Sequence, residues 1–129
     1  MSVAEVFSEL RGRGVMFTPE GDRLRWQAPK GAMTPELMDT LRLAKADILI
    51  LVSFVVAMVD VFAGGRTWIG YPGALADELA GAGLPDWPWP HDRLRQVLED
   101  ARPLLLEHRI TVEIHAGRGG RWVARIETP

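Results

Sequence analysis

Few side chains of this 129-residue chain have the types and spacing that catalysis needs. The three histidines, His91, His108 and His115, are spread and lack the spacing of metal ligands. None of the serines lies in the Gly-x-Ser-x-Gly turn of a hydrolase, and without cysteine there is no thiolate nucleophile. Adjacent carboxylates, as in Asp77-Glu78, point in different directions on a helix. We therefore expect a protein that is not an enzyme and uses no metal or cofactor.

Two further features have simple structural interpretations. The glycine-rich turn at 117–120 joins two expected strands and precedes no helix, so it is not a phosphate-binding loop. Asp60 interrupts an apolar stretch, where a carboxylate can be functional. Because Asp60 is near an expected helix end and close in sequence to Arg66, we expect these two residues to form a structural ion pair.

The composition is typical of a soluble globular protein. The chain is 47% hydrophobic and 25% charged. Its net charge of -2 gives no overall basic field that would attract nucleic acid. The first residues lack the basic and apolar regions of a signal peptide, so a cytoplasmic location is expected.

The stretch Ala46–Ala63 is the most apolar part of the chain. Its many β-branched residues would suit a strand, but it is longer than strands usually are. A membrane span needs about 20 apolar residues, and Asp47 and Asp60 interrupt this stretch, so we expect no membrane contact. Interpreted as a helix, it is apolar on all sides, which predicts a helix buried all round. It would join a module at residues 1–52 to one at 53–129, or form a homodimer seam.

The N-terminal module is predicted to begin with a helix and a β-hairpin. Helical spacing is seen in the apolar residues Val3, Val6, Phe7 and Leu10. Ser2 can cap this helix. The hairpin is expected from a strand at 15–18, turn residues at 19–22 and an alternating strand at 23–28.

A second helix follows the hairpin and precedes the apolar stretch. Thr34 is its expected cap, with Pro35 at the first helical position. Its buried side is expected to comprise Leu37, Met38, Leu41, Leu43 and Ala44. The predicted order is therefore helix, hairpin, helix, helix.

Four segments of this module, 10–15, 20–25, 28–37 and 45–49, closely resemble the TubC-type N-terminal docking domain. The resemblance covers residues 2–52. It implies a small αββαα unit, often dimeric, that stands at the front of nonribosomal peptide synthetase subunits. There it captures the C-terminal peptide of the upstream subunit. The condensation domain that would follow, with its His-His-x-x-x-Asp motif, is not found in this sequence.

The hairpin has a physical means of binding a peptide. A two-stranded sheet leaves an open edge of N–H and C=O groups, to which an extended peptide can add as another strand. Arg23, Arg25 and Lys30 would attract an acidic C-terminal peptide, with Trp26 beside them. The alternative is that the three cations are ordinary solvated charges and that Trp26 belongs to the core.

The C-terminal module is predicted to run helix, short strand, helix, helix and β-hairpin. After the apolar stretch come a strand at 67–70, a helix from Pro72 and a helix from about Asp92. Strands at 110–115 and 121–126 flank the glycine-rich turn. Between the helices, the tryptophans of the 84–90 connector are expected to pack on the core, because three prolines make that connector rigid.

This order resembles a winged helix, and the segment is similar to the unit near the C-terminus of phage and plasmid primase–helicase proteins. The resemblance rests on Trp68-Ile69-Gly70, the 77–79 segment, Trp87-Pro88, the 118–122 turn and four leucines, namely Leu75, Leu94, Leu98 and Leu104. No Walker A sequence of an ATPase accompanies it. In such a fold one helix enters the major groove of double-stranded DNA and the wing contacts phosphate or the minor groove.

Seven residues are candidates for DNA contact. Four lie on the expected helix and three on the wing: Arg93, Arg95, Gln96, Arg102, Arg118, Arg121 and Arg125. Asp92, Glu99 and Asp100 on the same helix would oppose a phosphate backbone. Winged helices also bind proteins, so both partners stay open.

The sequence thus predicts an α+β protein in which an αββαα docking-type module is fused through a buried helix to a winged-helix module. The first functional hypothesis is a non-catalytic adaptor that binds DNA and a protein partner in a phage, plasmid or other mobile-element setting. The alternatives are a stand-alone docking protein for a nonribosomal peptide or polyketide megasynthase, and a structural homodimer.

Overall fold

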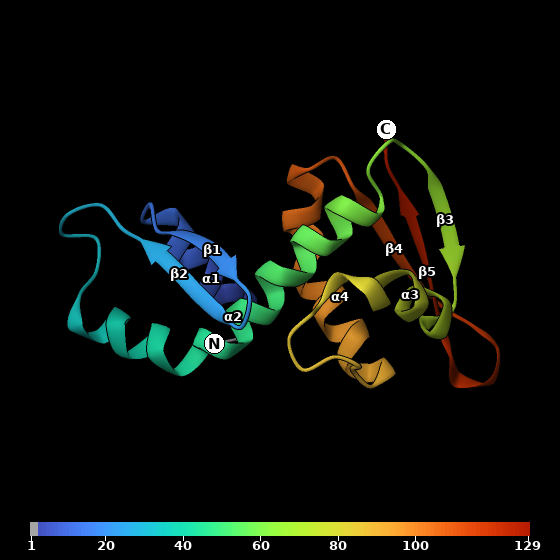
Figure 1. Ribbon diagram of the computed structural model, residues 1–129, viewed down its shortest axis with the longest axis horizontal. Coiled ribbons are helices and arrows are strands. Elements are labelled where there is room, and N and C mark those ends of the chain that lie inside the picture. The colour runs from blue at the N-terminus through green and yellow to red at the C-terminus, as the bar shows by residue number, and fades with distance from the viewer. Residues whose placement is uncertain (1–2) are drawn as a thin grey trace. The chain divides into compact units, whose positions relative to one another are not determined.

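A computed structural model describes residues 3–129, and the chain divides into two compact units, residues 1–53 and 54–129 (Figure 1). Ser2, the expected cap of the first helix, lies outside the described residues. Unit 1 begins with α1 (Val3–Gly12), which buries Val6, Phe7 and Leu10. Gly14 ends it in the left-handed conformation, with φ 87°. This conformation lets the Val15 N–H reach the Leu10 carbonyl at 3.1 Å, as in a Schellman motif.

The hairpin of unit 1 pairs β1 (Met16–Glu20) with β2 (Arg23–Gln27) in antiparallel register. Only Gly21 and Asp22 form the turn, so the expected four-residue turn at 19–22 was too long. Gly21 has φ 60°, as the first central residue of a type II′ turn requires. Pro19 stays within β1 because it is opposite Leu24 at a position where an edge strand needs no N–H donor.

A single helix, α2 (Pro35–Val61), replaces the two helices expected after the hairpin. Thr34 is its cap, since its Oγ1 accepts a hydrogen bond from the Leu37 N–H at 3.2 Å. Between Ala44, the last residue assigned to the second expected helix, and Ala46, where the apolar stretch begins, the sequence contains no glycine or proline. Nothing therefore interrupts the backbone ladder. On one continuous helix Leu41 and Leu43 point in nearly opposite directions. Leu41 is buried, whereas Leu43 is 88% exposed, so its expected burial was wrong.

The C-terminal end of α2 is buried on most sides but not all round. Phe54 and Met58 are fully buried in unit 2, while Val56 is 45% exposed and Asp60 is exposed. The expected pair of Asp60 with Arg66 was also wrong. Arg66 instead bonds Glu78 at 3.1 Å and lies over the Phe62 ring. No helix within residues 3–129 has both the length and the apolar content needed to cross a membrane.

Unit 2 places a three-stranded antiparallel sheet, in the order β3-β5-β4, beside helices α3 and α4 (Figure 1). Its elements are β3 (Thr67–Gly70), α3 (Pro72–Leu79), a short 3-10 turn η1 (Ala80–Ala82), α4 (His91–Glu107), β4 (Thr111–Ala116), a second 3-10 turn η2 (Arg118–Gly120) and β5 (Trp122–Glu127). The buried residues of the sheet include Val112, Ala124 and Ile126. Together the described residues form a mixed structure of helices and sheets, consistent with the expected α+β class. The winged-helix assignment stays a prediction.

The connector between α3 and α4 is fixed to the core through Trp89. This side chain is 5% exposed, and its Nε1 donates a hydrogen bond to the Pro85 carbonyl at 2.8 Å. Its ring centroid lies 5.9 Å from that of Phe54 and 5.2 Å from that of Trp87. The expectation that these tryptophans pack on the core is confirmed for Trp89.

Candidate functional site

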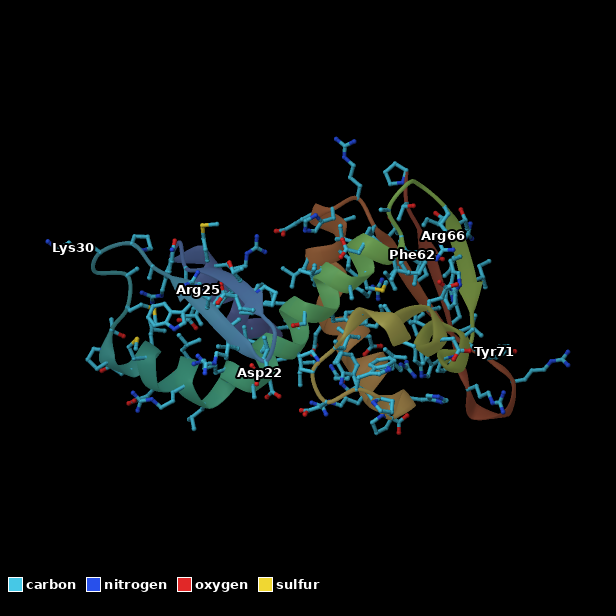
Figure 2. The ribbon with its side chains drawn as sticks, in the orientation of Figure 1. Asp22, Arg25, Lys30, Phe62, Arg66 and Tyr71 are labelled. Carbon is cyan, nitrogen blue, oxygen red and sulfur yellow. The ribbon has the colours of Figure 1, made fainter. Side chains whose placement is uncertain are left out.

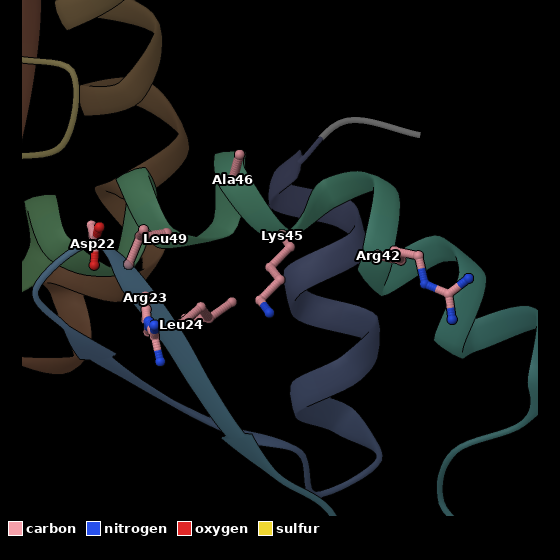
Figure 3. Close-up of a pocket in the computed structure, with 7 residues that line it drawn as sticks. All are labelled: Asp22, Arg23, Leu24, Arg42, Lys45, Ala46 and Leu49. Atoms are coloured by element: carbon pink, nitrogen blue, oxygen red, sulfur yellow. The ribbon is translucent and has the colours of Figure 1, made fainter.

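An open groove of about 580 Å³ in unit 1 runs between the hairpin and α2 (Figure 3). The residues that line it come from the hairpin turn, from β2 and from one stripe of α2: Asp22, Arg23, Leu24, Arg42, Lys45, Ala46 and Leu49. The α2 residues recur at i, i+3, i+4 and i+7, which places them on one face of the helix. The groove therefore belongs wholly to unit 1.

The β2 side of this groove is an open strand edge. In a two-residue hairpin the closing pair, Glu20 and Arg23, is hydrogen bonded, and bonded pairs then alternate along the ladder. Leu24 and Trp26 consequently direct their backbone N–H and C=O groups away from β1. A chain lying in the groove would meet these groups in the geometry of a neighbouring strand.

The groove carries excess positive charge. Arg23, Arg42 and Lys45 outnumber Asp22 by three to one, which leaves two net positive charges. Arg42 makes only a loose, exposed contact of 3.7 Å with Asp39. Arg23 and Lys45 have no ion pair among the residues that the structure describes. These cations are free to meet the carboxylates of a ligand.

The groove also has an apolar floor. Leu24 is 5% exposed and Leu49 8% exposed, so both are held by the core while contributing surface to the groove. Ala46 is small and exposed between Lys45 and Leu49. An extended ligand with alternating side chains can direct aliphatic groups to this floor and acidic groups to the cations.

The structure brings only one of the four predicted peptide-binding residues into this groove, namely Arg23. Arg25 is paired with Glu20 at 3.0 Å. Trp26 is half-buried opposite Phe17 of β1. Lys30 lies in the loop after β2, apart from the groove lining (Figure 2). Arg42, Lys45 and Leu49 were missed, although their helical spacing and two positive charges were visible in the sequence.

A second open groove in unit 1, of about 410 Å³, lies between α1 and α2. It is lined by Val3, Val6, Thr40, Leu43, Ala44 and Asp47. The exposed Leu43 side chain is its most prominent apolar group. Nothing in the structure shows what covers this surface.

Three of the four candidate DNA-binding residues on α4 have partners within the helix or beside it. Arg95 pairs with Glu99 at 3.4 Å, and Gln96 donates a hydrogen bond to Asp100 at 3.0 Å. Burial raises the pKa of Asp100, the Gln96 hydrogen bond lowers it and nearby Glu99 raises it, with an upward net shift. Arg93 lies over the Trp89 ring at 5.9 Å. Only Arg102 of this set is exposed without a partner in residues 3–129.

The expected wing residues divide into two groups. Arg118 and Arg121 are exposed beside the glycine-rich turn and have no hydrogen-bonding or ionic side-chain partner in the described part of the chain. Arg125 instead lies on β5, where it pairs with Glu127. Among residues 3–129 no group of three histidine or carboxylate side chains is placed to hold a metal ion.

Comparisons with known proteins concern unit 1. No curated protein and no solved structure matches the chain. Residues 3–52, which contain the hairpin and the groove, match the family model of the TubC N-terminal docking domain. This part of the chain is therefore similar to a docking domain, which suggests a protein–protein docking role.

Proposed function

We propose that unit 1 is a docking module that captures an extended acidic segment of a partner protein in the groove between β2 and α2. The observation that carries this proposal is that Arg23, Arg42 and Lys45 line one groove beside an open strand edge. The match of residues 3–52 to a docking domain supports it independently.

The captured segment adds to the hairpin as a third strand. Its backbone bonds the outward N–H and C=O groups of Leu24 and Trp26, which gives affinity with little dependence on sequence. Its alternate side chains meet either the Leu24 and Leu49 floor or the α2 cations, which gives preference for acidic residues among aliphatic ones. The charges also speed association at low salt.

The biological setting follows from the resemblance. A docking domain of this type in a nonribosomal peptide or polyketide megasynthase would take the acidic C-terminal peptide of another subunit, and we favour that role. The DNA adaptor is less well supported, because carboxylates pair with or lie beside the cations of α4. A homodimer through the exposed Leu43 surface is a third possibility.

A selection experiment tests the docking role without knowledge of the partner. The full chain is panned against a library of random peptides displayed with free C-termini, alongside the Arg42→Glu/Lys45→Glu variant. We expect peptides enriched in Asp and Glu among aliphatic residues, and loss of this enrichment with the variant. Peptides without acidic bias, or enrichment that the variant leaves unchanged, would overturn the proposal.

A further inference from the structure

Strand β3 of unit 2 is an open edge of the three-stranded sheet. The Thr128 N–H donates to the Arg66 carbonyl at 3.0 Å, so Arg66 and Thr128 form a hydrogen-bonded pair at one end of the β3–β5 ladder. Bonded pairs alternate in antiparallel sheets. Trp68 and Gly70 therefore face β5 with their backbone groups, whereas Thr67 and Ile69 direct theirs to the open side. The β3 edge thus presents unused donors and acceptors in strand geometry.

Apolar side chains accompany this edge. Ile69 is 63% exposed. Tyr71, which directly follows β3 (Figure 2), is 42% exposed. The turn at 117–121, which joins β4 to β5, is called the wing here. Tyr71 lies against its base, since a Cβ atom added at Gly117 would be 3.2 Å from Tyr71 Cε1. The same Cβ would be 3.0 Å from Val123 Cγ2. The open edge is therefore continuous with the wing through Tyr71.

The wing supplies unpaired positive charge at this place. Arg118 follows Gly117 directly, and the Gly117 N–H donates to the Arg121 carbonyl at 2.6 Å, so both arginines stand at the wing base. The carboxylates of the sheet are already engaged, because Glu127 pairs with Arg125 and Glu113 bonds His115 at 3.3 Å. No side chain of the described sheet neutralises Arg118 or Arg121.

We propose that the β3 edge, with Ile69, Tyr71, Arg118 and Arg121, is a second docking site that takes an extended acidic segment of a partner protein. The segment adds as a strand beside β3, and its carboxylates meet the two wing arginines. A strand edge specifies a polypeptide, because its N–H and C=O groups repeat at the spacing of a neighbouring strand. Charge complementarity specifies an acidic one. This inference does not depend on the groove of unit 1.

A proline substitution separates strand addition from folding. Ile69→Pro removes an N–H that the β3–β5 ladder does not use, and proline is tolerated at such edge positions. It also places a ring where the added strand would lie. The neutral variant Arg118→Gln/Arg121→Gln tests the charges without touching β3. Ile69→Thr is the matched control, because it shortens the side chain and keeps the backbone donor.

Binding is measured by fluorescence anisotropy with a labelled peptide of alternating Val and Glu residues. All variants are made in the full-length Arg42→Glu/Lys45→Glu protein, so that unit 1 does not contribute. We expect Ile69→Pro to weaken binding about tenfold or more. The wing variant should weaken it several-fold. Ile69→Thr, which loses apolar contact but keeps the backbone donor, should weaken binding less than Ile69→Pro does.

Several results would overturn this second site. One is that the Arg42→Glu/Lys45→Glu protein, with no change in unit 2, does not bind the peptide. Another is full binding by both Ile69→Pro and the wing variant. A third is a labelled random-sequence DNA duplex binding more tightly than the peptide, with loss on the wing variant alone, which would assign the wing to nucleic acid. Unchanged thermal unfolding of each variant is the control for folding.

Discussion

Reversing the charge of Lys45 tests whether the groove of unit 1, rather than the charge of the whole chain, attracts an acidic ligand. Lys45 is exposed and lines the groove. Lys30 is also exposed, lies in the same unit and is not part of the groove lining. Lys45→Glu and Lys30→Glu change the net charge of the chain by the same amount. They therefore form a matched pair that differs only in position.

The expected magnitude follows from the local charges. Lys45→Glu replaces one attraction by one repulsion, and an exposed pair contributes about 0.2–1 kcal/mol. The loss of binding free energy is then about 0.4–2 kcal/mol, or roughly 2-fold to 30-fold in Kd. Lys30→Glu should weaken binding by less than about 1.5-fold near physiological salt, because the Debye length is about 8 Å under those conditions.

The assay is anisotropy of a labelled acidic peptide at low and moderate salt. We expect the difference in peptide Kd between the two variants to become smaller as salt increases, because salt screens the attraction between the groove cations and the peptide. Equal weakening by Lys45→Glu and Lys30→Glu would refute a localised site. So would unchanged binding by Lys45→Glu with wild-type thermal stability.

Three further predictions concern stability, measured by chemical denaturation. Arg109 ends α4 in the left-handed conformation, with φ 61°. Arg109→Gly should raise the free energy of unfolding by about 0.5–1 kcal/mol, because glycine adopts this conformation without steric cost; a lower free energy of unfolding would contradict this. Gly14→Ala should cost at least about 1–2 kcal/mol, since the backbone is left-handed and the new Cβ would lie 2.9 Å from Pro29 Cγ; a neutral result would refute it. Burial raises the pKa of Asp100 in the folded protein, so protonation of Asp100 stabilises the folded state. This stabilisation is complete below the pKa of Asp100 in the unfolded chain and is lost as pH rises through its pKa in the folded protein. Asp100→Asn should therefore be at least as stable as wild type at neutral pH and lose that advantage in acid, and the opposite pH trend would count against this reasoning.

Local patterns predicted the elements of unit 1 well. The spacing of Val6, Phe7 and Leu10 predicted α1, and the alternation of Leu24 with charged neighbours predicted β2. These two predictions succeeded because they need only the side-chain periodicity over a few residues, which can be read directly from the sequence. The burial of Leu43 was predicted wrongly because Leu43 lies about 200° around the helix from Leu41, so the two side chains cannot share one buried face.

The candidate site was harder to predict because it joins distant segments. Arg23 was found from the hairpin alone, whereas Arg42 and Lys45 become functional candidates only once α2 packs beside β2. The spacing of 42, 45, 46 and 49 was available as a signal, but nothing in the sequence specified which helix face borders the strand edge. The partner of Arg66 was missed for the same reason, since Glu78 is reached through tertiary packing.

Hydrogen exchange of individual backbone amides, measured by NMR with and without an acidic peptide from the selection, tests the central claim most directly. A peptide that adds as a third strand beside β2 should slow exchange at the Leu24 and Trp26 amides, which face the open edge. Arg25, whose amide faces β1 already, should change little. Slower exchange confined to α1, to β1 or to unit 2, with Leu24 and Trp26 unaffected, would contradict docking in this groove.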